Sequence, residues 1–335
     1  MRNALIVGGT GLISTAITKQ LLARGARVTV YNRGQSAAAL PDGVGHIAGD
    51  RTDRAAFVQA FERERFDVVF DMICYTAEQA EDSVRAFQGR CEQLVFCSSA
   101  VVYGAKMPPH VLVDEQCPLE PVNDYGRSKV ACETAFRRAA ERGAFALTIL
   151  RPAHTYGPGC AMDDQLESDG STWDRVARGV PVLVAGDGLG LWQSTHRDDC
   201  ARLFSHAALS TKTYGEAYNA TGDEVVTWRD YYRECARALD TRAHVIFVPA
   251  RWLIAQDPER FSFLAQVSRF HCAYSPAKAR AHVPELRPQV GLEAGARETF
   301  ADMRARGAWR DSRDDAAYQR IVDRALSLGF EIEEA

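Results

Sequence analysis

The chain has 335 residues, 46% of them hydrophobic, which suffices for one large domain or two fused lobes with a substantial core. Its formal net charge of −4 and its isoelectric point near 6.1 give no electrostatic basis for binding nucleic acid or an anionic membrane. Its nine cysteines are odd in number and form no C-x-x-C pair, which argues against a disulfide framework or a metal site and favours a reducing, cytoplasmic setting.

No apolar run reaches the roughly 18 residues that a membrane-spanning helix needs, so we expect no membrane contact. The N-terminal run ALIVGGTGLI (4–13) could be taken for the apolar core of a signal peptide. Only one Arg precedes it, however, and no small-residue cleavage site follows. A strand followed by a glycine turn is the better interpretation.

Short apolar runs alternate with amphipathic segments of helix length over the first 151 residues. The apolar runs predict strands at 4–9, 27–32, 44–49, 66–73, 93–99 and 145–151. The amphipathic segments predict helices at 13–25, 53–65, 77–88 and 125–142. This alternation is typical of a parallel sheet covered on both faces, so we predict an α/β fold with a Rossmann-type, doubly wound sheet.

The alternation breaks after Pro152. Residues 157–192 are rich in Gly, Pro, Asp and Ser, 215–222 predicts one more strand returning to the sheet, and 224–335 is predicted to be mostly helical. We therefore expect a smaller, mostly helical C-terminal substrate lobe beside the dinucleotide-binding domain. The expected division is 1–165 plus about 193–225 for the Rossmann domain, and 166–192 plus 226–335 for the substrate-binding lobe.

The first predicted strand ends in the glycine-rich turn VGGTGLIS (7–14). Glycines three residues apart allow a tight turn and let backbone N–H groups approach a pyrophosphate at the start of the next helix. The pattern is G-x-x-G with Ser14 in the third position rather than G-x-G-x-x-G. Its position in the first βαβ unit favours a dinucleotide site over an ordinary strand–helix turn. The predicted contacts are Gly8, Thr10, Gly11, Leu12 and Ile13.

The end of the second strand bears on the choice of cofactor. A carboxylate there would bind a ribose 2′-hydroxyl, whereas a cation accommodates a 2′-phosphate. Here Asn32 and Arg33 end the strand and no acidic residue is present, so we predict NADP rather than NAD. A solvated arginine in a turn is the alternative interpretation of Arg33.

A second cofactor contact is predicted in AGDRTD (48–53), after the third strand. Asp50 is suitably placed to bind the adenine amino group, with Arg51 beside it. A helix cap at Asp50 or Thr52 explains the same residues equally well.

Four further motifs follow in order: FCSSAVVYG (96–104), NDYGRSK (123–129), RPAHTYGPG (151–159) and GDGLGLWQSTHRDD (186–199). In this order and spacing they closely resemble the extended short-chain dehydrogenase/reductase family, in its NAD(P)-dependent epimerase/dehydratase branch. The resemblance extends from residue 4 to about residue 225, and the conjunction of motifs is far more specific than any one of them.

The resemblance assigns Tyr125 as the acid/base, Lys129 as its helper and cofactor contact, and Ser99 as hydrogen-bond partner of the substrate hydroxyl. A phenol has a reference pKa near 10, so we expect the ammonium one helical turn away to lower the pKa of Tyr125 by favouring phenolate. Spacing of four places both side chains on one helix face. Ser98 is the less favoured alternative to Ser99.

Two departures from the family pattern narrow the expected reaction. Dehydratases of this family carry an acidic pair directly after the catalytic hydroxyl residue, where this chain has Ala100 and Val101. Neither side chain can move a proton, so dehydration is disfavoured. We still expect Ala100 to line the substrate site.

Trp192 stands where relatives that bind nucleotide sugars usually have a phosphate-binding Arg, and His154 stands near a frequent Asn. Both changes put a nucleoside-diphosphate substrate in doubt, although Arg175, Arg178 or Arg251 are alternative phosphate partners. Trp192 is suited to stacking on a sugar or a base.

Two histidines and an acidic cluster have alternative interpretations. His154 is either a second acid/base opposite Tyr125 or a hydrogen-bonding part of the pocket wall. His196 is either a substrate contact or a structural residue at the sheet edge. For the acidic cluster the preferred interpretation is a solvated loop, over a metal site or a site for a cationic amino group. Its members are Asp163, Asp164, Glu167 and Asp169.

We therefore predict an NAD(P)-dependent enzyme acting by hydride transfer at a secondary alcohol or ketone of a small, sugar-like substrate. Epimerase and net reductase or dehydrogenase remain open. The alternative is a non-catalytic cofactor sensor or RNA-binding protein of the same fold, although such relatives generally lack the tyrosine or the lysine. The resemblance also implies a homodimer formed through helices near 77–89 and 125–142.

Overall fold

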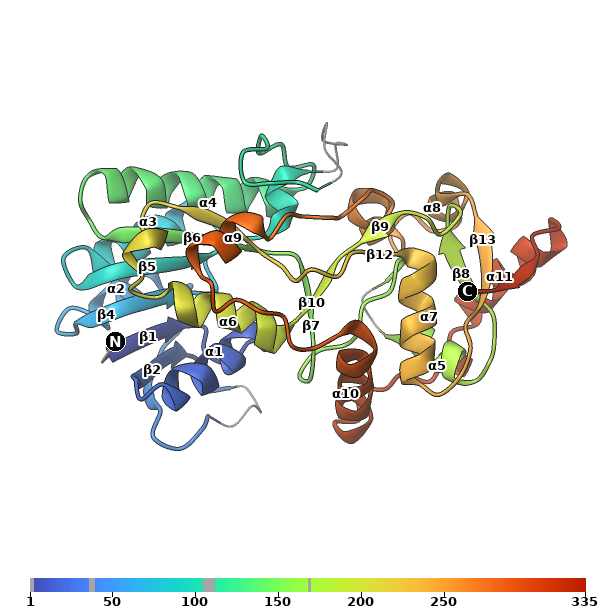
Figure 1. The fold of residues 1–335 in the computed structure, drawn as a ribbon, viewed down its shortest axis with the longest axis horizontal. Coiled ribbons are helices and arrows are strands. Elements are labelled where there is room, and N and C mark those ends of the chain that lie inside the picture. Colours follow the sequence, from blue (N-terminus) through green and yellow to red (C-terminus); the bar gives the residue numbers. More distant parts are fainter. Residues whose placement is uncertain (1–2, 36–39, 105–111, 168–169) are drawn as a thin grey trace.

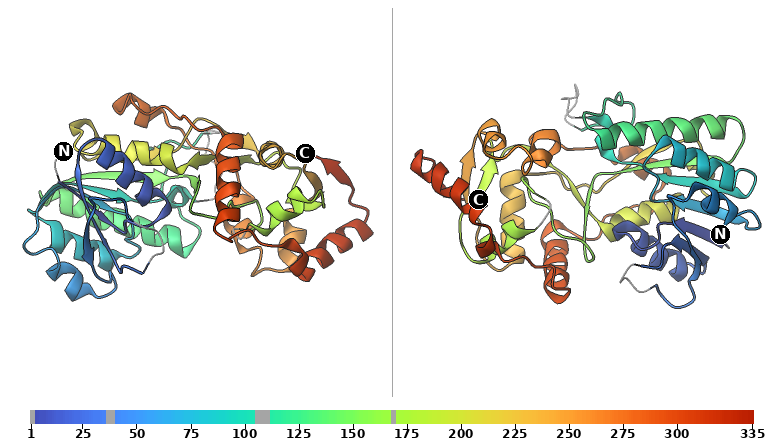
Figure 2. Two further views of the ribbon diagram at one scale, coloured as in Figure 1. Left: turned by 90° about the horizontal axis from the view of Figure 1, so that it is seen from below. Right: turned by 180° about the vertical axis from the view of Figure 1, so that it is seen from behind.

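The computed structural model describes residues 3–35, 40–104, 112–167 and 170–335. The chain forms two lobes arranged along one long axis, with the N-terminus in the first lobe and the C-terminus in the second (Figure 1). Views from below and from behind show the same division (Figure 2). Within the described ranges, no helix is both long and apolar enough to cross a membrane.

The first lobe is built on a seven-stranded sheet in the order β11-β6-β5-β4-β1-β2-β3, with every neighbouring pair parallel. The strands are β1 (Asn3–Val7), β2 (Arg27–Asn32), β3 (Gly45–Ala48), β4 (Phe66–Asp71), β5 (Cys91–Cys97), β6 (Ala146–Pro152) and β11 (Ala217–Ala220). The central strands are buried on both faces, which is why they were visible as continuous apolar runs.

Helices cover both faces of this sheet (Figure 1). One face is covered by α1 (Leu12–Ala23) and α6 (Arg197–Ala207). The other is covered by α2 (Arg54–Gln59), α3 (Ala77–Phe87) and α4 (Asp124–Glu141). The predicted Rossmann-type fold is therefore confirmed. The strand order reverses between β1 and β4, so the carboxyl ends of these strands flank the crevice in which such sheets bind ligands.

The second lobe contains a small sheet in the order β14-β13-β8, in which β13 pairs parallel with β8 and antiparallel with β14. Its strands are β8 (Val182–Ala185), β13 (His244–Val248) and β14 (Ile332–Glu334). Its helices are α5 (Ser171–Ala177), α7 (Trp228–Ala238), α8 (Ala250–Gln256), α10 (Leu292–Ala305) and α11 (Ala316–Ser327). The sequence prediction of mostly helix after residue 224 overlooked β13, an apolar run too short to show a period, and β14, whose residues IEE are exposed and form no apolar run.

Short elements connect the two lobes. Two small strand pairs join β7 (His154–Tyr156) to β10 (Ser194–His196) and β9 (Leu191–Trp192) to β12 (Val226–Thr227). The remaining helical turns are η1 (Ala100–Tyr103), η2 (Thr211–Thr213), η3 (Leu264–Ser268), α9 (Ala277–His282) and η4 (Ser312–Asp314). β7 follows directly after β6, and β10 leads directly into α6. The two strands therefore carry the chain from the carboxyl ends of the sheet strands into the second lobe and back.

A buried polar network holds α4 against the sheet. Arg151 on β6 makes two hydrogen bonds to the Glu133 carboxylate, at 2.9 and 2.7 Å, and both side chains are almost fully buried. Ser98 donates to the same carboxylate at 2.6 Å, and Arg151 also donates to the Tyr103 hydroxyl, which donates to Asn219. Since every charge here has a partner, the position of α4 depends on the whole set.

We expect Glu133→Gln to lower the free energy of unfolding by about 3–5 kcal/mol, because it leaves the Arg151 guanidinium buried without a counter-charge. Urea unfolding followed by circular dichroism measures this. Glu141→Gln, at an exposed position on the same helix, is the control and should change the unfolding free energy by less than about 0.5 kcal/mol. Equal effects of the two variants would contradict the structural role of the Glu133–Arg151 pair.

Candidate active site

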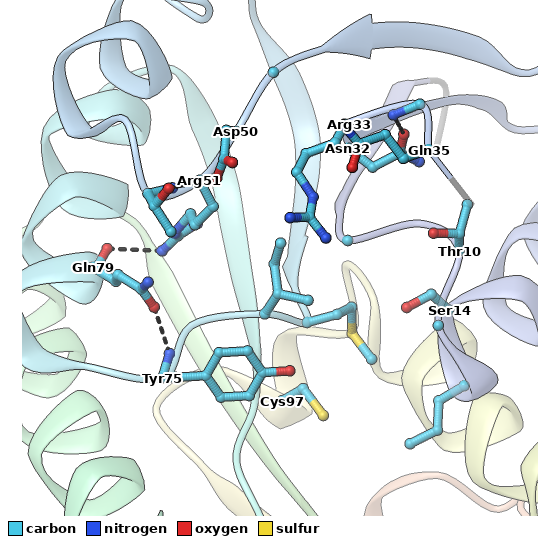
Figure 3. A pocket seen from close by; sticks show the side chains of 18 of the residues that line it. Thr10, Ser14, Asn32, Arg33, Gln35, Asp50, Arg51, Tyr75, Gln79 and Cys97 are labelled. Carbon is cyan, nitrogen blue, oxygen red and sulfur yellow. Dashed lines mark hydrogen bonds between the residues drawn. The ribbon is translucent and has the colours of Figure 1, made fainter. Parts of the chain in front are cut away.

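A cavity of about 770 Å³ lies in the crevice at the carboxyl ends of β1, β2 and β4 (Figure 3). We call it the dinucleotide cavity. Every residue predicted to bind the cofactor, apart from Lys129, lines it. These residues are Gly8, Thr10, Gly11, Leu12, Ile13, Asn32, Arg33, Asp50 and Arg51.

The glycine turn leaves room for a phosphate group at the start of α1. Gly8 has φ +91°, and a Cβ at this position would overlap the Ile73 side chain. Gly11 is the N-cap of α1, whose first N–H groups receive no side-chain cap and whose first turn carries no acidic residue. Unsatisfied N–H groups at the positive end of a helix favour an anion, so this end of the cavity fits a dinucleotide pyrophosphate.

The loop after β2 contributes one cation to the cavity. Arg33 is exposed, and its guanidinium extends from the loop toward the centre of the cavity (Figure 3). Asn32 fixes the turn itself, because its side-chain oxygen accepts from the Gly34 N–H at 2.8 Å and lies 3.0 Å from the His46 Nε2. The two predicted residues thus differ in kind: Asn32 shapes the loop, and Arg33 carries a charge into the cavity.

Asp50 and Arg51 direct their side chains to different surroundings. Asp50 lies at the cavity wall, where hydrogen bonds from the Thr52 N–H and hydroxyl, both at 2.8 Å, hold the pKa of its carboxyl below its usual range. Arg51 is buried and directs its guanidinium to Asp71 on β4, at 3.1 Å, and to α3 through Ser83, at 2.9 Å. The Arg51 side chain thus forms an ion pair with β4 and a hydrogen bond with α3, and a cofactor contact at Arg51, which also lines the dinucleotide cavity, stays a prediction.

A second cavity, of about 370 Å³, lies where residues of both lobes meet. We call it the substrate cavity, after the role that the sequence predicts for five of its lining residues. It brings together Ser99, Ala100, Tyr125, His154 and Trp192, all of which the sequence predicted. The sequence missed the part of its wall that comes from the second lobe. That part consists of Phe263, Val267, Cys272 and Tyr274.

Lys129 lies between the two cavities. It is almost fully buried, and its ammonium donates to the carbonyls of Cys74 and Cys97, both at 2.9 Å. The Nζ atom lies 4.7 Å from the ring centroid of Tyr75, which lines the dinucleotide cavity, and 5.7 Å from that of Tyr125. Sequence reasoning missed Tyr75, because a tyrosine after a buried strand carries no distinguishing pattern.

The phenol of Tyr125 stays protonated more strongly than the sequence suggested. Desolvation by neighbouring protein atoms raises the pKa of Tyr125 even though the side chain is 46% exposed, and the Ser99 hydroxyl opposes this shift. This direction is opposite to the predicted effect of Lys129, whose ammonium is bound to two carbonyls and lies 5.7 Å from the centroid of the Tyr125 ring.

The structure separates the two candidate serines. Ser98 is buried and donates to Glu133, so it belongs to the network that holds α4. Ser99 is half-buried, lines the substrate cavity and is close enough to Tyr125 to influence its pKa. Ser99 is therefore the serine available to a substrate.

A histidine–carboxylate pair lies in the wall of the substrate cavity. His154 Nε2 is 3.0 Å from the Asp163 carboxylate, and His154 Nδ1 is 2.8 Å from the Ser194 hydroxyl. Trp192 lies against the same histidine, with ring centroids 5.2 Å apart, and stacks on Trp228 at 4.5 Å. The aromatic wall and the pair together set the polarity of the cavity.

His196 does not line either cavity, so its prediction as a substrate contact is not supported by the geometry. It is the N-cap of α6, and its ring is buried within 3.8 Å of Asp198 and 3.7 Å of Glu298. Burial lowers the pKa of His196, which keeps the imidazole neutral. These contacts favour the alternative interpretation, in which His196 is a structural residue at the sheet edge.

The acidic cluster is not a solvated loop, contrary to the preferred interpretation. Asp164 is fully buried and accepts hydrogen bonds from the Leu166 and Glu167 N–H groups, and burial raises the pKa of its carboxyl to about 7. Glu167 pairs with Arg260. Asp169 lies outside the described residues. Over the ranges that the structure describes, no group of three or more His, Cys, Asp or Glu residues is arranged to hold a metal ion.

The alternative phosphate partners lie away from the substrate cavity, since none of Arg175, Arg178 and Arg251 lines it. Arg175 donates to the Pro181 carbonyl at 2.9 Å. Arg178 donates to the Ser312 hydroxyl at 3.0 Å. Among the residues that the structure describes, no arginine lines the substrate cavity.

The sequence pattern of the NAD dependent epimerase/dehydratase family matches residues 4–221. The 2'-dehydrokanamycin reductase of Streptomyces kanamyceticus is 30% identical over 267 residues, covering 79% of this chain and 74% of that protein. The chloroplast stem-loop binding protein of 41 kDa b from Arabidopsis thaliana is 27% identical over 348 residues, covering 98% and 86%. The solved structure of UDP-glucose 4-epimerase from Thermus thermophilus, in complex with NAD, is 25% identical with a TM-score of 0.69, covering 91% and 99%.

We expect Gly8→Ala to weaken dinucleotide binding at least tenfold, because the added Cβ overlaps Ile73 and forces the turn to move. Isothermal titration with NADPH measures the affinity. Gly25→Ala is the control: it has a similar φ of +75°, but nothing lies within 4 Å of the added Cβ. Unchanged NADPH affinity in Gly8→Ala would show that the turn does not hold the dinucleotide.

Proposed function

The chain belongs to the NAD dependent epimerase/dehydratase family, and on this basis we propose that it transfers hydride at a secondary alcohol or ketone of a sugar-like substrate. The observation that carries the proposal is the position of Lys129 and Tyr125. Lys129 lies between the two cavities, and Tyr125 and Ser99 open onto the smaller one. A proton donor, a hydrogen-bond partner and a fixed cation are thus close together.

A nicotinamide dinucleotide in the larger cavity would supply or accept the hydride. The chain's own residues manage the proton and the orientation. Tyr125 exchanges a proton with the substrate oxygen, because a carbonyl that gains hydride becomes an alkoxide and needs a proton donor within hydrogen-bond reach. Ser99 hydrogen-bonds the same oxygen and fixes its position. Lys129, held by two carbonyls, keeps a positive charge beside the phenol as negative charge develops.

We propose net reduction rather than epimerisation, on the similarity to 2'-dehydrokanamycin reductase. A protonated phenol is the form that donates to a carbonyl, and a phenol is protonated at neutral pH with or without the raised pKa of Tyr125. Ala100 and Val101 leave no acid/base pair at the positions where dehydratases of the family carry one.

We propose NADP as the preferred cofactor. Arg33 extends its guanidinium into the dinucleotide cavity from the end of β2, where a 2′-phosphate would be read, and no carboxylate ends that strand. The T. thermophilus epimerase carries NAD in its solved structure, so the cofactor preference of this chain rests on its own Arg33.

A second candidate function follows from the similarity to the chloroplast stem-loop binding protein, which covers 98% of this chain. A non-catalytic binding protein would not require Tyr125 and Lys129 to face the junction of two cavities. The net charge of −4 also disfavours RNA as a ligand. Hydride transfer is therefore the better-supported function.

We expect Tyr125→Phe to lower kcat/KM for NADPH-dependent ketone reduction by about 10²- to 10⁴-fold, with little change in NADPH affinity, because the proton donor is lost while the cavity keeps its shape. Absorbance of NADPH follows the reaction. Tyr214→Phe, which removes a surface hydroxyl bonded to Glu92, is the matched control and should keep full activity. Undiminished activity in Tyr125→Phe would refute the proposed role of Tyr125, whereas absence of NADPH-dependent ketone reduction by the unaltered chain would favour the binding-protein alternative.

We expect Arg33→Gln to weaken NADPH binding about tenfold or more and to leave NADH binding within about twofold, because only the 2′-phosphate needs the guanidinium. Parallel isothermal titrations with both dinucleotides measure the ratio. Arg63→Gln removes the same charge at an exposed position outside the cavity and is the control. Equal losses for NADPH and NADH would mean that Arg33 does not select the cofactor.

A further inference from the structure

The described lining residues of the substrate cavity include one carboxylate, Asp163, and neither a lysine nor an arginine. His154 Nε2 lies 3.0 Å from that carboxylate, and its Nδ1 lies 2.8 Å from the Ser194 hydroxyl. Both ring nitrogens of the histidine thus have partners, and Asp163 is the carboxylate that the described lining offers to a ligand.

No arginine or lysine of the described lining offsets the Asp163 carboxylate, and two arginines outside the cavity bind other partners. Arg260 forms ion pairs with both Glu167 and Asp315. Arg178 lies 3.6 Å from the Asp174 carboxylate and donates to Ser312. Since phosphate recognition requires cations or free N–H groups, a diphosphate entering this cavity would meet a carboxylate without a compensating charge.

Trp192 adds a second feature that points to a ligand. The residue lines the cavity and is only 3% exposed, yet its indole Nε1 has no hydrogen-bond partner among the described residues. A buried donor without a partner costs free energy, which a ligand oxygen would recover by accepting the hydrogen bond. The ring itself is packed against Trp228, His154 and Phe263, so its N–H group is the part of the side chain that has no partner among the described residues.

We propose that the substrate cavity binds a phosphate-free amino sugar or aminocyclitol, with its ammonium group against Asp163 and a hydroxyl oxygen against the Nε1 of Trp192. This inference rests on the proposed function, because Tyr125 and Ser99 in the same cavity define the reacting oxygen. The volume of about 370 Å³ lies at the small end of the range for ligand pockets, roughly 300–1,000 Å³, and suits a single ring.

The Asp163 carboxylate determines which class of ligand binds more tightly. An ammonium beside a half-buried carboxylate forms a charge-assisted hydrogen bond, which is stronger than a bond between neutral groups. A neutral sugar gains only neutral hydrogen bonds at this position, and a nucleoside diphosphate brings like charge toward Asp163. The order of affinity is therefore amine first, neutral sugar second and nucleotide sugar last.

The test is a binding measurement on the full chain with saturating NADPH. The reduced cofactor cannot donate hydride to an alcohol, so ligands without a ketone bind but do not react. The ligands are methyl aminohexosides with the amine at C2, C3, C4 or C6, methyl glucoside, and UDP-glucose. We expect at least one aminohexoside to bind about tenfold or more tightly than methyl glucoside, and UDP-glucose to bind most weakly. Isothermal titration gives each dissociation constant.

Two controls assign the selectivity to Asp163. Asp163→Asn should bring the affinity for the amine down to that of the neutral sugar, whereas Glu259→Gln, which removes one charge at an exposed position outside the cavity, should leave it unchanged. N-acetylation of the preferred ligand removes its charge without altering the protein, so the test stands even where Asp163→Asn folds poorly.

The proposal is overturned if no aminohexoside binds, if UDP-glucose binds more tightly than all of them, or if neither Asp163→Asn nor N-acetylation weakens the amine. These outcomes leave hydride transfer standing, because the binding assay does not involve Tyr125 chemistry. Conversely, absence of ketone reduction by the unaltered chain would refute the proposed function without altering the order of affinities. The two failures are therefore distinguishable.

Discussion

The buried ammonium of Lys129 is the interaction on which the arrangement of the site depends. It donates to the carbonyls of Cys74 and Cys97, which follow β4 and end β5, and so ties α4 to the carboxyl ends of two central strands. Tyr125 lies one helical turn earlier on the same face, which brings its phenol to the substrate cavity. A charge buried this deeply requires such partners, so the constraint that satisfies Lys129 also positions Tyr125.

The two cavities on either side of this lysine have opposite electrostatic character. The dinucleotide cavity combines the positive end of α1 with the Arg33 guanidinium, a combination suited to phosphate groups. The substrate cavity holds a carboxylate, a histidine and an aromatic wall. In the dinucleotide cavity, backbone N–H groups and a loop residue make the surface suited to anions. In the substrate cavity, side chains of the connecting strands and the second lobe determine the charge and polarity.

The parts of the site that sequence reasoning predicted are those whose physical cause is local. The turn at Gly8 follows from backbone sterics, and the pair Tyr125–Lys129 follows from helix periodicity. The parts that it missed depend on partners distant in the chain. Arg51 pairs with Asp71, twenty residues away, and the wall at Phe263 comes from the second lobe. No local sequence pattern predicts contacts between residues so far apart in the chain.

The incorrect prediction for the pKa of Tyr125 shows that spacing along a helix does not by itself determine how a charge shifts a pKa. Spacing of four residues correctly places Lys129 near Tyr125, but the effect of a charge depends on where the charge is directed and on what surrounds the phenol. The two carbonyls hold the ammonium 5.7 Å from the centroid of the Tyr125 ring, and desolvation is the largest cause of the raised pKa, although the side chain is 46% exposed. The phenol proposed as proton donor and the Asp163 carboxylate proposed as partner of an ammonium group line the same cavity. Under these two proposals, the site is suited to reducing a ketone on a ring that carries a positive charge.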